Sequence, residues 1–125
     1  DSVAETLDVE GIATFKRGLS QESIRTRINQ GNLFVVCRNE NTIVGVGEIR
    51  NNNHLNLLFV EPCAQGKGIG HRIFLALLTK ISQSEVTVNS SLNSVGAYKK
   101  YGFVVSGPKS EVRGIRYQPM LYKIG

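Results

Sequence analysis

An apolar strand runs directly into a glycine-rich turn in the stretch LLFVEPCAQGKGIG, residues 57–70. The glycines of the turn let the backbone come close to a ligand and adopt dihedral angles that are closed to other residues. Apolar residues recur at spacings of four over residues 70–81, which predicts a helix with a broad buried face after the turn. The free N–H groups and the dipole at the start of such a helix favour a bound phosphate. The stretch therefore predicts a site for a di- or triphosphate ligand.

The residues around the turn narrow the kind of phosphate ligand. Lys67, His71 and Arg72 place positive charge at the start of the predicted helix. No Gly-Lys-Ser/Thr sequence follows a four-residue gap, so the turn is not a Walker A loop. His71 stands where a dinucleotide fingerprint needs glycine or alanine, which excludes that pattern too. On the turn alone, a glycine-rich helix entry that binds nothing remains an alternative.

Strands and helices alternate through the rest of the chain. A capping box at residues 2–5 predicts an early short helix, and Ser20 opens a second helix that ends at Gly31. Gly45 and Gly47 lie inside a predicted strand, where they indicate either a close backbone or ligand, or a thin strand under a bulky neighbour. Strands are expected over residues 33–37, 43–49, 54–60, 85–88, 103–106 and 117–124, and a further helix over residues 93–101. This pattern is typical of one α/β layered domain, residues 1–125.

The composition fits a globular protein with an anionic ligand. The 125 residues are 41% hydrophobic, and the net charge of +5 suits a nucleotide cofactor, a nucleic acid or an anionic membrane surface alike. No recognised nucleic-acid motif is present, and the 7% of aromatic residues form no stacking pattern. No apolar run approaches the length of a membrane span. We therefore expect neither a nucleic-acid nor a membrane partner.

The two cysteines indicate the cellular setting. Cys37 lies in an apolar run and is expected to pack as a small hydrophobic residue, while Cys63 follows a proline in a loop. Neither has metal-ligand spacing, so no metal site is expected. Residues 1–10 show no basic apolar leader, and a chain of this size can build a core without a disulfide. We expect a reducing, cytoplasmic setting.

Two motifs in order resemble those of the GNAT superfamily of N-acetyltransferases. The pattern Gln/Arg-x-x-Gly-x-Gly/Ala of its acyl-CoA-binding motif is met by Gln65, Gly68 and Gly70. Downstream, AYKKYGF at residues 97–103 resembles the family's Tyr-x-x-x-Gly-Phe motif, and PMLY at residues 119–122 resembles its last strand. The resemblance covers roughly residues 33–124. It implies a GNAT-like α/β fold, in which helices flank a mixed, mostly antiparallel sheet.

The sequence departs from the family pattern at two places. The family opens with a strand before its first helices, whereas none is predicted here, so the first strand is expected to be missing or trimmed. Ser91 stands where the family often has an asparagine seven residues before the motif tyrosine, which leaves the role of Asn93 open.

The resemblance implies an N-acetyltransferase that moves an acetyl group from acetyl-CoA to a primary amine by direct attack. Tyr98 matches the family's general acid, and Glu48 and His54 are candidate bases by position. The backbone N–H of Phe59 or Val60 is the implied donor to the oxyanion. For Glu48 the alternative is an outward carboxylate, and for His54 a polar residue beside a turn. The implied cofactor-binding residues are Phe59, Val60, Gln65, Gly66, Lys67, Gly68, Ile69, Gly70, His71, Arg72, Asn93 and Tyr98.

The acceptor is expected to be a small-molecule or peptide amine that binds across the sheet from the cofactor. Arg113 and Arg116 either contact an acidic acceptor there or belong to a solvated basic loop. Because dimers are frequent in the resembled family, a homodimer is one expected assembly. The main alternative function is a catalytically silent acyl-CoA-binding module. A hydrolase built on Cys63 and His71 is a weaker alternative, because no third group is in view to orient the histidine.

Overall fold

The structure, a computed structural model, describes residues 2–5, 9–16 and 19–124. Its elements in chain order are β1 (Ser2–Glu5), α1 (Val9–Phe15), α2 (Gln21–Asn29), β2 (Leu33–Asn39), β3 (Thr42–Arg50), β4 (His54–Val60), the 3-10 helix η1 (Pro62–Ala64), α3 (Ile69–Leu78), β5 (Glu85–Ser91), the 3-10 helix η2 (Leu92–Ser94), α4 (Val95–Tyr101), β6 (Val104–Val105), β7 (Ser110–Val112) and β8 (Ile115–Lys123).

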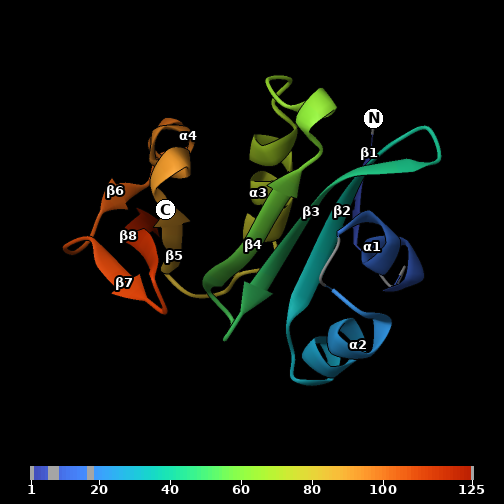
Figure 1. The fold of residues 1–125 in the computed structure, drawn as a ribbon, viewed down its shortest axis with the longest axis horizontal. Helices are drawn as coiled ribbons and strands as arrows, with labels where there is room; N and C mark the ends of the chain where they lie inside the picture. The colour runs from blue at the N-terminus through green and yellow to red at the C-terminus, as the bar shows by residue number, and fades with distance from the viewer. Residues whose placement is uncertain (1, 6–8, 17–18, 125) are drawn as a thin grey trace.

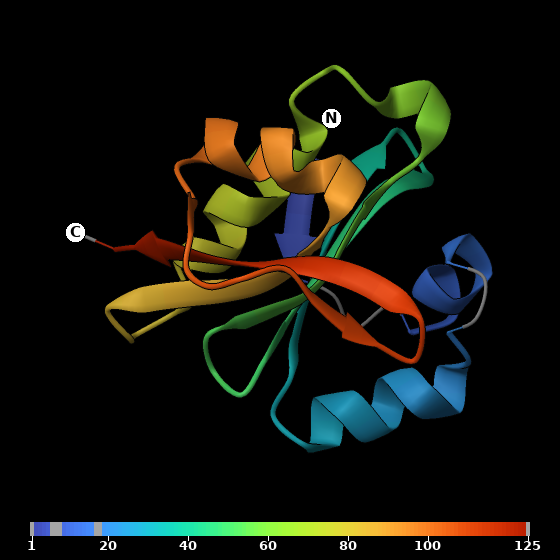
Figure 2. The ribbon, with the colours of Figure 1, turned by 60° about the vertical axis from the view of Figure 1, so that its left-hand side comes forward.

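One sheet forms the middle layer of the molecule. Its strands follow the order β1-β2-β3-β4-β5-β8-β6, and β7 pairs with β8. Helices α3 and α4 cover one face, and α1 and α2 cover the other face beside β2 and β3 (Figures 1 and 2). The mixed α/β fold with a mostly antiparallel sheet, implied by the resemblance, is confirmed.

The pairing between β4 and β5 is parallel and short, whereas the other strand pairings in the described part of the chain are antiparallel. Only two residue pairs join these strands, His54 with Thr87 and Leu55 with Val88. Beyond them the strands diverge, and Figure 1 shows the two halves of the sheet separating toward the end of β4 that leads into η1. The sheet therefore contains a wedge-shaped gap with free strand edges on both sides.

Helix α3 packs closely on β3 because two glycines leave room for it. A Cβ on Gly45 would lie 2.7 Å from Ile73 Cδ1, and one on Gly47 would lie 2.6 Å from Ile73 Cγ2. Of the two readings of these glycines, the structure shows the thin strand under a bulky neighbour. The close packing fixes the start of α3, and with it the glycine turn, against the sheet.

Each face of the sheet carries its own core. The face under α3 buries residues such as Phe74, Leu77 and Met120, whereas the face under α1 and α2 buries Ile12 and Ile24. Side chains along β4 alternate between these faces: Leu58 and Val60 pack toward α3, and Leu57 and Phe59 pack toward α1 and α2.

The prediction that a capping box at residues 2–5 opens the early helix is wrong, and the first helix, α1, begins only at Val9. Residues Ser2–Glu5 form β1, which pairs antiparallel with β2 from Ser2 opposite Arg38 to Glu5 opposite Val35. The family's first strand is therefore present, and the expectation that it is missing is also wrong. A four-residue match to a capping box is weak evidence for a helix. The backbone N–H and C=O groups that a helix would satisfy are satisfied equally well by pairing with the open edge of β2.

Other boundaries differ by a few residues. Helix α3 ends at Leu78 rather than at residue 81, and β5 runs on to Ser91. The polar segment before the last strand contains the short strand β7, which forms a hairpin with β8.

Candidate active site

A cleft of about 670 Å³ lies between the glycine turn and α4. Eight of the residues expected to bind the cofactor line it: Val60, Gln65, Gly66, Gly68, Ile69, Gly70, Asn93 and Tyr98. The remaining lining residues are Leu58, Ser94, Gly96, Ala97, Lys100 and Tyr101. The cleft thus brings together both motifs that carried the sequence resemblance.

The turn presents backbone donors to this cleft. Gly66 and Gly68 have φ values of 81° and 78°, a backbone conformation that residues other than glycine rarely adopt. Gly68 caps α3, and as a glycine it offers no side chain to the first N–H groups of that helix. These N–H groups and the positive end of the dipole suit an anion.

The hydrogen-bonding pattern of β4 determines which of its amides face the gap. Glu61 N donates to Val44 O at 2.8 Å, and hydrogen-bonded pairs alternate along an antiparallel ladder. Phe59, two residues before Glu61, therefore turns its N–H toward β3, while Leu58 and Val60 turn theirs into the gap. The bond from Gln65 Nε2 to Val60 O, 3.0 Å long, agrees with this orientation. Of the two predicted oxyanion donors only Val60 faces the gap, and Leu58 joins it.

Tyr98 lies at the wall of the cleft and is 8% exposed. Its ring packs edge-on against Tyr101 and Phe103, with centroids 5.9 Å and 5.2 Å away. Burial, and then the neighbouring Tyr101, raise the pKa of Tyr98 to about 12. The phenol is therefore protonated across the physiological range and is able to donate a hydrogen bond.

None of the three cations predicted at the turn, Lys67, His71 and Arg72, is among the residues that line the cleft. Lys67 is exposed in the turn, and the ring of His71 stacks on Tyr101 at 4.9 Å. The guanidinium of Arg72 points to β2, where Nη2 lies 3.4 Å from Cys37 Sγ, so its predicted role in pyrophosphate binding does not fit its position. Among the described residues that line the cleft, Lys100 is the only charged one.

Glu48 lies on the opposite face of the sheet, under α2. It is fully buried, and its Oε1 pairs with Nη1 of Arg27 at 3.0 Å. The alternative of an outward carboxylate is thereby excluded. On the same face, the ring of Phe59 packs against that of Phe15, with centroids 5.5 Å apart, and Lys16 Nζ lies 4.7 Å from the centroid of the Phe59 ring.

His54 stands at the point where β4 and β5 still pair. Its Nδ1 lies 2.8 Å from Thr87 Oγ1. Burial, and then the charge of Arg50, lower the pKa of His54 from its ordinary value of 6.5. The imidazole is therefore neutral near pH 7, as a proton acceptor must be.

Several other expectations can be placed on the structure. Arg116 belongs to the β7–β8 hairpin, where it forms a weak, exposed pair with Glu111 at 3.9 Å, and Arg113 occupies the turn of that hairpin. Cys37 is buried and Cys63 exposed, and both are free thiols. Within residues 2–5, 9–16 and 19–124, no group of His, Cys, Asp and Glu is placed to hold a metal ion, and no helix is long and apolar enough to cross a membrane.

The sequence contained signals for some of the residues that were missed. Leu58 lies two residues before Val60 in the same strand, and residues two apart in a strand face the same side of the sheet. Lys100 and Tyr101 follow Ala97 at helical spacings of three and four, which places them on the same face of α4.

Comparison with known proteins identifies the family. Residues 3–124 match the model of the acetyltransferase (GNAT) domain. The peptidyl-lysine N-acetyltransferase YjaB of Salmonella typhimurium is 31% identical over 93 residues, which cover 74% of this chain and 63% of that protein. The chain thus matches less than two thirds of that relative's length.

Two solved structures show the same fold at low sequence identity. Smu.2055 from Streptococcus mutans UA159 has a TM-score of 0.84 at 17% identity, covering 98% of this chain and 99% of that one. An aminoglycoside 6'-N-acetyltransferase complexed with coenzyme A has a TM-score of 0.72 at 12% identity, and the match covers 98% of this chain and 97% of that one. With the family model spanning nearly the whole chain, this protein belongs to the GNAT family of acetyltransferase domains.

Proposed function

We propose that the protein is an N-acetyltransferase that moves an acetyl group from acetyl-CoA to a primary amine by direct attack. The observation that carries this proposal is the cleft between the glycine turn and α4, which is continuous with the free edge of β4. Membership of the GNAT family supports it. The relative named a peptidyl-lysine N-acetyltransferase makes a lysine side chain the first acceptor to test.

The phosphates of acetyl-CoA fit the end of the cleft at the glycine turn. The N–H groups that open α3 would donate to the pyrophosphate, and Lys100 would add a full positive charge from the opposite wall. The pantetheine arm, which carries amide groups, would lie along β4 like an added strand and pair with Leu58 and Val60. The short pairing between β4 and β5, which leaves the edge of β4 unpaired beyond Leu55, supports this placement.

In the reaction, the amine nitrogen bonds to the thioester carbonyl carbon, and the carbon–sulfur bond then breaks. Negative charge develops on the carbonyl oxygen, and an amide of β4 that faces the gap, from Leu58 or Val60, donates to it. The sulfur leaves as a thiolate toward α4, where Tyr98 lines the cleft.

Tyr98 would stabilise this thiolate mainly as a hydrogen-bond donor. A thiol has a pKa of about 8.5, whereas burial raises the pKa of Tyr98 to about 12. Complete proton transfer from the phenol to the sulfur would therefore be uphill, and the thiolate takes its final proton from solvent. This refines the general-acid role that the resemblance implied.

His54 is our candidate for receiving the proton that the amine loses. It lies four residues before Leu58, at most about 13 Å along the strand, so it would act through bridging water. Its lowered pKa keeps it neutral and able to accept a proton near pH 7. Glu48, the other candidate, already carries the ion pair with Arg27.

The proposal is tested by measuring thiol release from acetyl-CoA with a panel of amines that includes a lysine peptide. We expect release with at least one amine, and thermal stabilisation by acetyl-CoA alone. Stabilisation without thiol release for any amine would instead support a catalytically silent acyl-CoA-binding module. Absence of both effects would exclude acetyl-CoA as the ligand. The cytoplasmic location and the homodimer stay predictions.

A further inference from the structure

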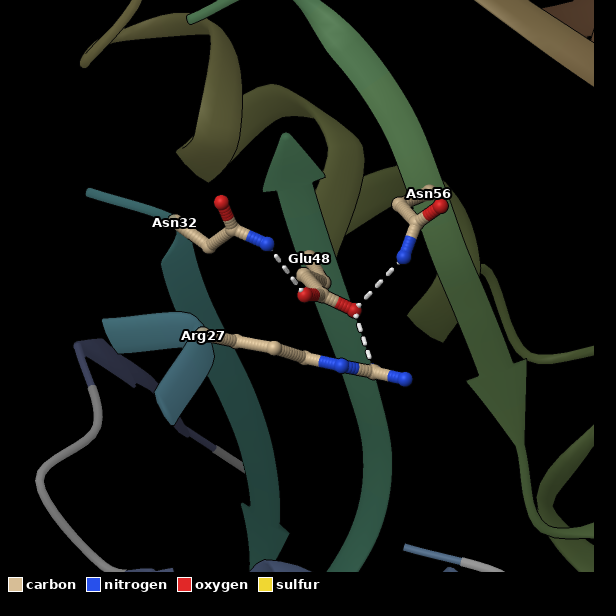
Figure 3. Close-up of polar contacts among 4 residues, drawn as sticks. All are labelled: Arg27, Asn32, Glu48 and Asn56. Carbon is tan, nitrogen blue, oxygen red and sulfur yellow. Dashed lines mark hydrogen bonds and ion pairs between the residues drawn. The ribbon is translucent and has the colours of Figure 1, made fainter. Parts of the chain in front are cut away.

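Glu48 is the centre of a cluster that joins three separate segments of the chain. Figure 3 shows its carboxylate with Arg27 from α2, Asn32 from the loop before β2, and Asn56 from β4. Oε1 accepts from Arg27 Nη1 at 3.0 Å and from Asn56 Nδ2 at 3.1 Å, and Oε2 accepts from Asn32 Nδ2 at 2.8 Å. Glu48 is fully buried, so these three donors replace the water that would otherwise solvate its charge.

Most of the hydrogen-bonding capacity of Glu48 is used within this cluster. A carboxylate offers about four acceptor positions, and three of them are filled by Arg27, Asn32 and Asn56. Removing the carboxylate would leave the cation of Arg27 without its counter-charge. The geometry therefore favours a role in which Glu48 holds its neighbours in place.

Asn56 occupies a special place in β4. Glu48 pairs with Leu57 and Ile49 pairs with Leu55, so Asn56 is the extra residue of a β-bulge. It is also the first residue of β4 after the pairing with β5 ends at Leu55. Its side chain reaches Glu48 on the face of the sheet under α1 and α2, where the acceptor is expected to bind and which is called the acceptor face below, and Asn56 itself is exposed. Asn56 therefore stands on the acceptor face where the gap in the sheet begins.

The carboxylate of Glu48 also fixes which way the Asn56 amide points. A carboxylate only accepts hydrogen bonds, so the NH₂ group of Asn56 must face it and the carbonyl oxygen must face away. Figure 3 shows Oδ1 of Asn56 directed away from Glu48. The result is an oriented hydrogen-bond acceptor, two residues before Leu58, whose amide faces the gap.

We propose that Oδ1 of Asn56 binds the attacking nitrogen of the acceptor, and that Glu48 is a positioning residue that orients Asn56. This inference rests on the proposed acetyl transfer. A neutral carbonyl accepts a hydrogen bond from an ammonium before it is deprotonated and from the amine afterwards, so Asn56 can hold the nitrogen throughout the approach to the thioester. Its removal should therefore weaken acceptor binding and leave acetyl-CoA binding unchanged.

The test compares Asn56→Ala, Glu48→Gln and the double variant with the wild-type enzyme. Asn29→Ala, which removes an exposed amide at the end of α2, is the control. The measurements are the KM for the acceptor, kcat, the pH profile of kcat/KM, and the Kd for acetyl-CoA by calorimetry. We expect Asn56→Ala to raise the acceptor KM about tenfold, as for one lost hydrogen bond to a charged group, with the Kd for acetyl-CoA within about twofold.

The double variant separates positioning from base catalysis. If Glu48 acts through Asn56, Glu48→Gln raises the acceptor KM in the wild-type background but adds little in the Asn56→Ala background. The acidic limb of the pH profile also persists in Glu48→Gln. Loss of that limb, or a fall in kcat from Glu48→Gln that is equally large in both backgrounds, would identify Glu48 as the base and overturn the proposal.

Asn56→Ala alone decides the matter if Glu48→Gln does not fold. An unchanged acceptor KM in a folded, active Asn56→Ala enzyme overturns the inference and leaves the proposed acetyl transfer intact. A wild-type protein that transfers no acetyl group to any amine overturns both. The two failures are therefore distinguishable.

Discussion

The hydroxyl of Tyr101 occupies the space beside Gly70 at the start of α3. A Cβ built on Gly70 would lie 2.7 Å from that oxygen, closer than real Cβ contacts allow. Tyr101 in turn stacks on His71 and on Phe74, with centroids 4.9 Å and 6.0 Å away. The glycine turn and α4, the two walls of the cleft, are thus in direct contact at this point.

This contact predicts that Gly70→Ala is destabilising. The added methyl group must displace Tyr101, and overpacking of this kind costs about 1–3 kcal/mol. We expect a lower melting temperature and weaker acetyl-CoA binding. Gly70→Ala/Tyr101→Phe should recover most of the loss, because the next atoms, Val60 Cγ2 and Tyr101 Cζ, lie at ordinary distances of 3.6 Å and 3.8 Å. A double variant as unstable as Gly70→Ala would show that the hydroxyl is not the cause.

Lys100→Gln should weaken acetyl-CoA binding. One lost charge-assisted contact to a phosphate corresponds to a rise in Kd of roughly 10- to 100-fold. Lys99→Gln is the matched control, since Lys99 lies on the same helix but not in the lining of the cleft. Calorimetry at two salt concentrations checks the result, and the effect of Lys100→Gln should shrink as salt rises. Equal losses in the two variants would point to a general surface charge effect.

Tyr98→Phe should lower kcat and leave the Kd for acetyl-CoA nearly unchanged. Loss of a hydrogen-bond donor to the leaving thiolate corresponds to a fall in kcat of roughly 10- to 100-fold. Because burial raises the pKa of Tyr98 to about 12, the wild-type enzyme should show no loss of activity from ionisation of this phenol below about pH 10. Stopped-flow thiol release over a pH series provides the measurement. Full activity in Tyr98→Phe would remove the tyrosine from the chemistry.

The stability of the protein should depend on pH through His54. Burial lowers the pKa of His54 in the folded state, so the unfolded chain binds the proton more tightly. The contribution of His54 to the free energy of unfolding is therefore fully present above pH 6.5. It is lost as the pH falls from 6.5 toward the folded-state pKa of His54. Urea unfolding of the wild type and of His54→Gln, at pH 7.5 and pH 5, isolates this contribution. The wild type should lose more stability than the variant; equal losses would contradict the assignment.

Much of the fold could be predicted because its elements carry local signals. The apolar repeat of α3 and the glycines before it are readable from residues 57–81, and β4 was predicted with the bounds His54–Val60 that the structure shows. The first strand was missed because Ser2–Glu5 becomes a strand only through the neighbouring β2. Pairing with a distant segment leaves no periodic trace in four residues.

The site residues that come from one continuous segment could be predicted from the sequence. Those whose role depends on contacts between several segments could not. The direction of the Phe59 amide depends on the register between β3 and β4, which no single strand encodes. The environment of Glu48 depends on Arg27, Asn32 and Asn56 meeting from three segments. No spacing rule connects these residues, so sequence reasoning could propose a base at Glu48 but could not see its partners.

The gap between β4 and β5 also bears on how an unpaired strand edge is kept from pairing with another chain. Unpaired strand edges normally invite pairing with another chain. Here the unpaired edge of β4, with the amides of Leu58 and Val60, faces the interior of the sheet and is bounded by β5 and α4. A second protein strand would have to thread between them, whereas a slender chain of amides can lie there alone. The opening therefore suits a ligand thinner than a polypeptide, and the unpaired edge of β4 is shielded from strands of other chains.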